Sequence, residues 1–193
     1  MAKITTAPAT PDRWDDVQRA LTGGGEGSWC QCAWPVLPAS EWRDPSVAER
    51  KERLRSELDA RPAPGLVAYV DGAAAGWVRV GPRPVQRRVL RSRIVTQGSQ
   101  EPRDDPSVWA VTCFSVRKEH RRQGVVGALL AAAVEHASRN GARMVEAYPL
   151  DTSLARASTN ELFVGTLSTF LRAGFHEVAR PTSRRAVVAL DVR

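Results

Sequence analysis

Continuous and alternating apolar runs mark the strands expected in this chain. Residues 65–80 hold two β-rich runs that flank Asp71-Gly72, a dipeptide that favours a two-residue hairpin turn. The run at 108–116 (VWAVTCFSV) is almost wholly apolar, which is typical of a central strand buried on both faces. Two further strands are predicted at 143–151 and 185–192.

Apolar residues at helical spacing predict the helices. Trp14, Val17 and Leu21 follow Thr10-Pro11, a favourable helix start. The other helices are expected from Asp44-Pro45 to Leu58, along Val126, Leu130, Ala133 and Ala137, and at 162–173. The segment 81–106 is polar and rich in arginine, and it is expected to be a long excursion. The order of elements predicts a mixed α/β (α+β) domain.

Length and composition suit one soluble domain covering residues 1–193. The chain is 42% hydrophobic and 25% charged, and no apolar run approaches the ~20 residues that span a bilayer. The first residues carry no apolar stretch of the signal-peptide kind. We therefore expect a cytoplasmic protein with no membrane partner. Its three cysteines, an odd number, are expected to be reduced thiols.

The formal charge is +7 and the sequence pI is near 10.1. An excess of this size favours an anionic partner, such as a phosphorylated cofactor, an acidic substrate or nucleic acid. A general preference for arginine over lysine is the alternative explanation. No nucleic-acid recognition motif accompanies the charge, so a nucleic-acid partner is not expected.

The stretch 116–130 (VRKEHRRQGVVGALL) joins the buried strand to a helix and has the chemistry of an anion site. The first N–H groups of a helix lack internal partners and attract negative charge. Gly124 has no Cβ, so a phosphate can approach the backbone, and Arg121 and Arg122 supply charged donors. The stretch matches neither the Walker loop nor the Rossmann fingerprint.

This stretch resembles the acyl-CoA site of the GCN5-related N-acetyltransferase (GNAT) superfamily. The family pattern is a strand ending in Val, four residues, then Arg or Gln, Gly three positions later, and Gly or Ala two positions after that. Here Val116, Arg121 and Gly124 match, whereas Val126 departs from the pattern. The segment 170–179 (FLRAGFHEVA) is similar to the family's closing segment. The resemblance implies a twisted mixed sheet with two splayed central strands, flanked by helices.

The resemblance also implies acetyl-CoA as co-substrate, lying in the splay. Its pantetheine arm would pair with the central strand, and its pyrophosphate would meet the helix N-terminus. The residues implied are Phe114, Ser115, Val116, Arg121, Arg122, Gln123, Gly124, Val125, Val126, Gly127 and Ala128.

The usual proton-transfer groups of the family are missing. The central strand has no Glu, and Phe170 occupies the position of the family's Tyr. Glu146 and Tyr148 alternate on one strand and share a face, so they are the candidates for base and acid. The alternative is a strand-end carboxylate and a packed aromatic. Cys113 is either an acyl-accepting nucleophile or a small buried hydrophobe.

The segment WCQCAW suggests a wall of the acceptor pocket. Trp29 and Trp34, with Cys30 and Cys32, would give an apolar or cation–π surface for an amine. Core packing of the neighbouring helices is the alternative. Two cysteines fall short of the four ligands of structural zinc, so no metal is expected.

These features together predict acetyl transfer from acetyl-CoA to an amine of unspecified identity. The alternative is a CoA-binding sensor or interaction module that has lost catalysis. Dimers are frequent in the family, so a homodimer is one expected state. The segment Arg83–Arg93 is interpreted as a solvated excursion, with an anion-docking role as the alternative.

Overall fold

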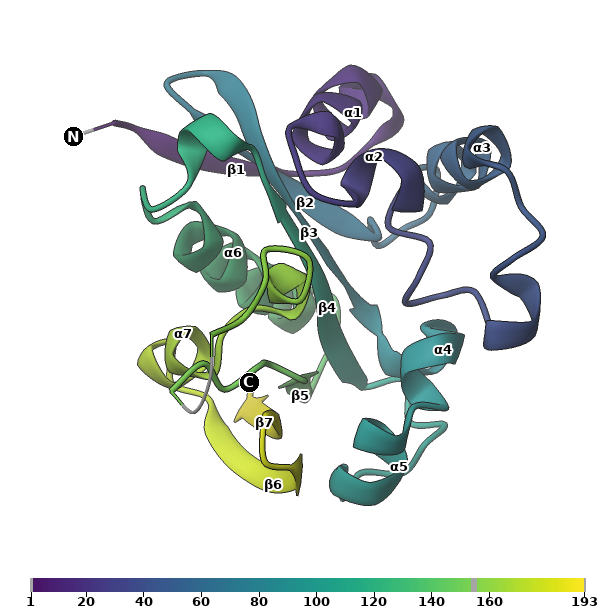
Figure 1. Cartoon of the computed structure of the whole chain (residues 1–193), viewed down its shortest axis with the longest axis vertical. Coiled ribbons are helices and arrows are strands. Elements are labelled where there is room, and N and C mark those ends of the chain that lie inside the picture. The colour runs from purple at the N-terminus through teal and green to yellow at the C-terminus, as the bar shows by residue number, and fades with distance from the viewer. Residues whose placement is uncertain (1, 154–155, 193) are drawn as a thin grey trace.

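The computed structural model describes residues 2–153 and 156–192 as a seven-stranded sheet with helices on its faces (Figure 1). The strand order is β1-β2-β3-β4-β5-β7-β6. The strands are β1 (Ile4–Pro8), β2 (Gly65–Val70), β3 (Ala73–Pro82), β4 (Val108–Val116), β5 (Met144–Ala147), β6 (His176–Thr182) and β7 (Arg185–Asp191).

Helices cover both faces of the sheet. They are α1 (Trp14–Thr22), α2 (Gly27–Cys30), α3 (Val47–Glu57), α4 (Arg87–Leu90), α5 (Arg93–Gly98), α6 (Val125–Arg139) and α7 (Leu167–Arg172). Short 3-10 helices occur at Pro11–Arg13, Ala39–Glu41, Arg83–Val85, Lys118–His120 and Leu162–Val164. Helix α6 packs on β2 and β3 from one side, and α1 packs on β3 from the other.

The central strands β4 and β5 separate along their length. They pair in parallel from Val108–Met144 to Val111–Ala147, and β5 then ends. Strand β4 continues to Val116 with β3 on its other side. Among the described residues, no strand pairs with the β5-side edge of β4 beyond Val111. The mixed fold and the splayed centre predicted from the sequence are thus confirmed.

The strongest sequence signals give the best-placed elements. Strand β4 coincides with the predicted buried strand, and α6 begins directly after Gly124. The hairpin of β2 and β3 turns at Asp71 (φ 48°) and Gly72 (φ 84°), the left-handed conformations that such a turn needs.

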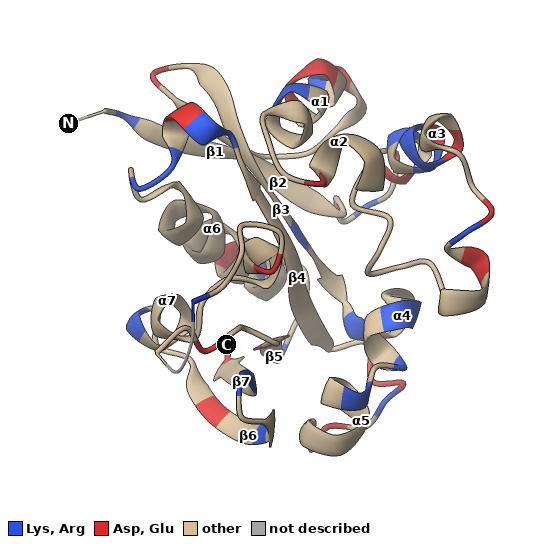
Figure 2. Ribbon diagram, in the orientation of Figure 1, with Lys and Arg blue, Asp and Glu red and all other residues tan. Residues whose placement is uncertain are grey.

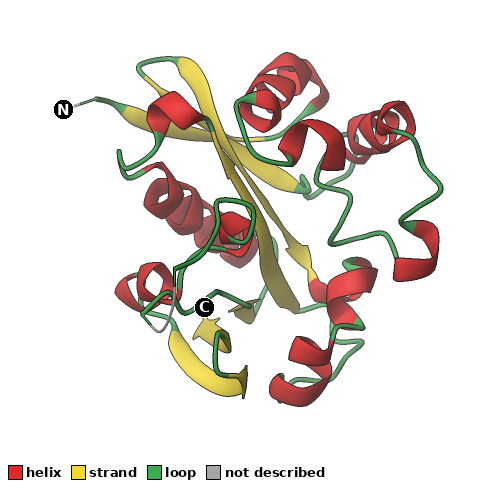
Figure 3. Cartoon of the chain, in the orientation of Figure 1, coloured by secondary structure: helices red, strands yellow, loops and turns green. Residues whose placement is uncertain are grey.

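Other segments differ from the prediction. The polar segment 81–106 contains α4 and α5 where a loop was expected (Figure 3). The expected helix at 162–173 is interrupted at Gly165, whose φ is 77°. Strands β1 and β6 were not predicted. Both are edge strands with partly exposed, partly polar residues, so neither carries the apolar run of a buried strand.

Helix α3 begins at a capping box rather than at Asp44-Pro45. The Ser46 hydroxyl accepts from the backbone N–H of Glu49 at 3.2 Å, and the Glu49 carboxylate accepts from the backbone N–H of Ser46 at 2.6 Å. Replacing Ser46 with Ala should lower the free energy of unfolding by about 1 kcal/mol, because an N-cap hydrogen bond is lost. Urea titration would measure it. Ser56→Ala, at a position inside the same helix, is the control expected to change little.

Candidate functional site

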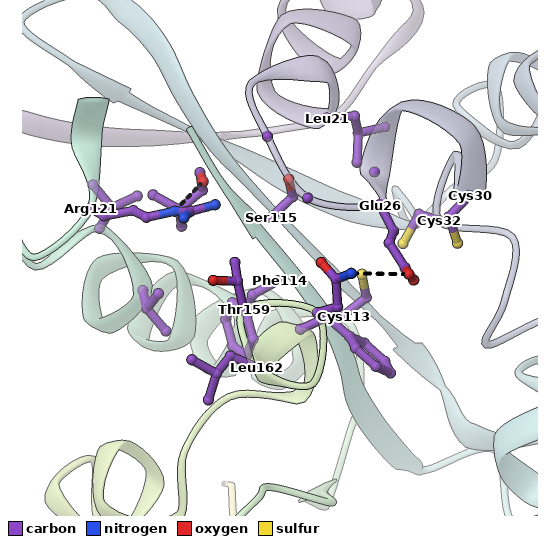
Figure 4. Close-up of a pocket in the computed structure, with 18 of the residues that line it drawn as sticks. Leu21, Glu26, Cys30, Cys32, Cys113, Phe114, Ser115, Arg121, Thr159 and Leu162 are labelled. Carbon is purple, nitrogen blue, oxygen red and sulfur yellow. Dashed lines mark hydrogen bonds between the residues drawn. The ribbon is translucent and has the colours of Figure 1, made fainter. Parts of the chain in front are cut away.

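One large cavity, of about 1190 Å³, opens beside the unpaired part of β4 (Figure 4). Its walls come from the end of β4, the start of α6, the segment around α2, and residues 159–173. These parts are distant in the sequence, and the splay of β4 from β5 brings them around one space. The cavity is large enough for an extended cofactor together with a second substrate.

The start of α6 forms one end of the cavity. Gly124 is its N-cap in the left-handed conformation, with φ 85° and no side chain to cap the helix. The cavity is lined by Gly124, Val125, Val126 and Gly127 from the first turn. Because backbone N–H groups at a helix start attract anions, this end suits a phosphate group.

Basic residues precede this helix start. Arg121 and Arg122 line the cavity, and the Arg121 Nε donates to the carbonyl oxygen of Val116 at 3.3 Å. Arg122 has a φ of 60°, so the loop turns sharply just before Gly124. Figure 2 shows Lys and Arg on this turn, with further groups of them on α3 and α4. The positive charge near α6 adds to the helix dipole there.

Strand β4 supplies the wall next to the helix start. Cys113, Phe114, Ser115 and Val116 all line the cavity. The Ser115 hydroxyl donates to the carbonyl oxygen of Ala20 at 3.2 Å, which ties α1 to this strand. The β5-side edge of β4 carries backbone groups that an extended ligand could pair with, in the way an added strand does.

Most of the sequence-predicted cofactor residues lie around the cavity. The residues that line it are Phe114, Ser115, Val116, Arg121, Arg122, Gly124, Val125, Val126 and Gly127. Gln123 and Ala128 do not line the cavity. The Gln123 side chain donates to the carbonyl oxygen of Glu119 at 2.9 Å, and the backbone N–H of Ala128 donates to the carbonyl oxygen of Gly124 at 3.0 Å.

The predicted substrate wall also lies at the cavity. Trp29, Cys30, Cys32 and Trp34 all line it. The tryptophans are not empty cation sites, however. The Arg50 guanidinium lies 4.4 Å from the ring centroid of Trp42 and 5.2 Å from that of Trp29. The Arg88 guanidinium lies 4.8 Å from the ring centroid of Trp34. The protein's own arginines therefore already provide a cation–π partner for each ring.

A carboxylate at the cavity was not found by sequence reasoning. Glu26 lies in the TGGGEG segment before α2, and it is the one Asp or Glu among the described residues lining the cavity. Its Oε1 accepts from Asn160 Nδ2 at 3.3 Å. Thr159, Phe163 and Arg172 of the far wall were missed as well. The glycine-rich segment after α1 contains no sequence pattern that indicates that Glu26 faces the cavity.

The predicted catalytic pair lies outside the cavity. Glu146 and Tyr148 do not line the cavity, and their exposed fractions are 1% and 4%. Glu146 accepts from Arg83 Nη1 at 2.7 Å, from Ser99 at 2.6 Å and from Tyr148 at 2.9 Å. Burial and the Glu146 charge raise the pKa of Tyr148 well above its usual value. Both residues thus form a closed buried cluster, which corresponds to the structural alternative.

The arginine-rich segment explains why this strand face is closed. Arg83 has an exposed fraction of 0%, and α4 and α5 pack Val89 and Val95 against Tyr148 and Val187. The expectation of a wholly solvated excursion is therefore wrong for these residues. Arg87, farther out, makes an exposed ion pair with Glu41 at 3.3 Å.

The described residues contain no group of three or more His, Cys, Asp or Glu side chains arranged to hold a metal ion. The three cysteines are free thiols. None of the described helices is both long and apolar enough to cross a bilayer.

Comparisons with known proteins agree with this geometry. The model of the acetyltransferase (GNAT) family matches residues 28–162. A search of curated proteins finds no match. Among solved structures, the chain resembles a GNAT acetyltransferase from Streptococcus pneumoniae with 13% identity and a TM-score of 0.58, over 99% of this chain and 100% of that one. The chain also resembles the GNAT domain of S. lividans PAT, with 18% identity and a TM-score of 0.57, over 99% of this chain and 90% of that one. At these identities the structural similarity establishes the fold.

Proposed function

Because the chain belongs to the GNAT acetyltransferase family, we propose that it transfers an acetyl group from acetyl-CoA to an amine. One observation carries the proposal: the unpaired edge of β4 and the uncapped start of α6 open into the same cavity. A strand edge suits an amide-containing arm, and a helix start suits a pyrophosphate. Acetyl-CoA carries both groups on one molecule.

The chain's own groups would hold the cofactor in a fixed direction. Arg121, Arg122 and the backbone of the first turn of α6 would bind the phosphates, and Phe114 to Val116 would bind the arm. Bound acetyl-CoA supplies a thioester that an amine can attack. With the phosphates at the start of α6, the acetyl end would extend along β4 toward Cys113 and the α2 segment, both of which line the cavity.

The acceptor would enter between α2 and residues 159–163. Glu26 offers a negative charge there, and Asn160 holds its carboxylate. An ammonium group would be attracted to Glu26, while Trp29 and Trp34 provide an apolar wall. An amine must lose a proton before it attacks, and Glu26 is the carboxylate positioned to receive it. We assign Glu26 this role in place of Glu146.

The proposal is tested by measuring CoA release with a panel of amines. We expect sustained release with at least one of them. Glu26→Gln should then lower kcat by about a hundredfold, at the lower end of general base effects, while acetyl-CoA affinity stays unchanged. Glu52→Gln, an exposed change on α3, is the matched control. Tight acetyl-CoA binding without release for any amine would reject the transferase and support the CoA-binding sensor.

A further inference from the structure

Arg88 of α4 borders the aromatic end of the cavity, which is lined by Trp29, Trp34, Trp42 and Phe163. Its guanidinium carbon lies 4.8 Å from the ring centroid of Trp34 and 5.4 Å from that of Trp42. The backbone N–H groups of Arg88 and Val89 donate to the carbonyl oxygen of Pro35, another lining residue, at 3.1 Å and 3.3 Å. These bonds fix the start of α4, and with it Arg88, against the cavity wall.

The charge of Arg88 has no counter-charge within residues 2–153 and 156–192. No described carboxylate pairs with its guanidinium, and no described group accepts a hydrogen bond from it. Its Nη1 is buried without a partner, although the residue as a whole is only partly buried. Burial lowers the pKa of Arg88 from its usual value. Because a guanidinium stays protonated and carries five N–H donors, an anionic ligand beside it would be stabilised.

Two arginines in the core show how this fold neutralises a guanidinium when no ligand is near. Arg79 pairs with Glu57 at 2.6 Å, and Arg83 pairs with Glu146 at 2.7 Å. A charge removed from water needs such a partner. Arg88 differs because it lies beside a cavity, so a bound molecule can supply the negative charge that the protein does not.

A second guanidinium adds to the positive charge at the aromatic end. The Arg50 guanidinium lies 4.4 Å from the ring centroid of Trp42, and it donates only to the carbonyl oxygens of Trp29 and Trp42. No carboxylate of the described residues pairs with it. Because like charges repel, two uncompensated guanidiniums beside Trp42 disfavour an ammonium group at this end and favour an anionic group.

The negative charge of the cavity lies at a different part of its wall. Glu26 accepts from Asn160 at 3.3 Å (Figure 4). Phe163, in the same short segment as Asn160, packs edge-on against Trp34 with ring centroids 5.5 Å apart. This segment therefore runs from the carboxylate of Glu26 to the ring beside Arg88. One bound molecule would meet a negative group at one end and a positive group at the other, with aromatic rings between them.

We propose that the acceptor is an amine that also carries an anionic group, a carboxylate or a phosphate. Arg88 binds the anionic group, and the amine faces Glu26. A guanidinium can bind either anion through two parallel N–H donors. The same layout discriminates against a diamine, because its second ammonium group would face Arg88 and Arg50. This inference rests on the proposed function and names the class of its acceptor.

The first test compares acceptors that differ in one group. CoA release would be measured with ω-amino carboxylates and ω-amino phosphates of increasing chain length, and with the ω-amino amides and diamines of the same lengths. For at least one anionic amine, kcat/KM should exceed that of its amide and its diamine by about tenfold or more, the effect of one hydrogen bond to a charged group. The carboxylate and phosphate arms show which anion is preferred.

The outcomes of this comparison separate the inference from the proposed function. Equal or higher kcat/KM for the amides or diamines would overturn the inference and leave the proposed function intact. No CoA release with any amine would instead reject the transferase on which the inference rests.

The second test changes the charge at position 88. Arg88→Gln should raise KM for the preferred anionic amine about tenfold, with kcat and the KM of the matching amide nearly unchanged. Arg88→Glu should reverse the selectivity in favour of the diamine, which a purely structural role of Arg88 would not produce. Arg87→Gln is the matched control, because the neighbouring Arg87 is exposed and already pairs with Glu41 at 3.3 Å. Unchanged selectivity in folded Arg88→Glu protein would overturn the inference.

Discussion

Gly124→Val should weaken acetyl-CoA binding by about tenfold or more, a loss of about 1.4 kcal/mol or greater. Gly124 is the N-cap of α6 at φ 85° and lines the cavity. The nearest atom to an added Cβ is Ile4 Cδ1 at 3.9 Å, so the protein itself leaves this space open. A branched side chain would fill the approach to the first N–H groups of α6. Calorimetric titration with acetyl-CoA measures the loss.

A control must show whether Gly124→Val weakens acetyl-CoA binding by crowding the ligand or by straining the backbone. Gly141 lies just beyond the other end of α6 at φ 84°, with no atom within 4 Å of an added Cβ. It does not line the cavity. Gly141→Val therefore has a similar conformational cost with no effect expected on acetyl-CoA affinity. Gly124→Ala adds only a Cβ at the same φ of 85°, so it should crowd the phosphate less than Val does. Equal affinities for Gly124→Val and wild type, both folded, would place the phosphates elsewhere.

The cofactor end was predictable because its signals are local. A continuous apolar run, a short basic loop ending at Gly124, and an apolar helix lie within residues 108–139. Each of these patterns depends on near neighbours, so the sequence defines β4, the turn and α6 without knowledge of the rest. The strand at 143–151 was predicted from its own pattern as well, and the family resemblance added only that it separates from the strand at 108–116.

The environment of Glu146 was not predictable for the opposite reason. Alternation correctly placed Glu146 and Tyr148 on one face, as their 2.9 Å hydrogen bond shows. What covers that face is α5 and Arg83, and Arg83 precedes Glu146 by 63 positions. The segment 81–106, which holds Arg83 and α5, looks like a solvated excursion because it is polar and rich in arginine. The sequence holds no local sign that one arginine turns inward.

The Cys32 environment has the same long-range origin. Its donors, Trp77 and Arg79, follow it by 45 and 47 positions, on a strand that sequence patterns place correctly. Neither the CQC spacing nor the composition indicates which residues of β3 lie beneath it. The WCQCAW segment was predicted to face the acceptor side, but the groups that its thiols contact could be known only from the folded structure.

Glu146→Gln is expected to lower the free energy of unfolding by about 3 kcal/mol, because the change leaves a buried guanidinium without its counter-ion. Arg83 and Glu146 have side-chain exposures of 0% and 1%. Arg83 would keep its bonds to Ser99 and to the carbonyl oxygens of Glu101 and Pro102, but none of these partners carries a charge. Urea unfolding followed by circular dichroism gives the measurement.

The matched control is Glu135→Gln on α6. Its ion pair with Arg139 is of the i,i+4 kind, with side-chain exposures of 61% and 75%, and such pairs contribute about 0.3–0.5 kcal/mol. Replacing Glu with Gln should thus lower the free energy of unfolding strongly at the buried position 146 and only slightly at the exposed position 135. Acetyl-CoA affinity should be unchanged in both folded variants, since neither residue lines the cavity. If Glu146→Gln lost kcat but kept full stability, Glu146 would be part of the chemistry and the assignment of proton transfer to Glu26 would fail.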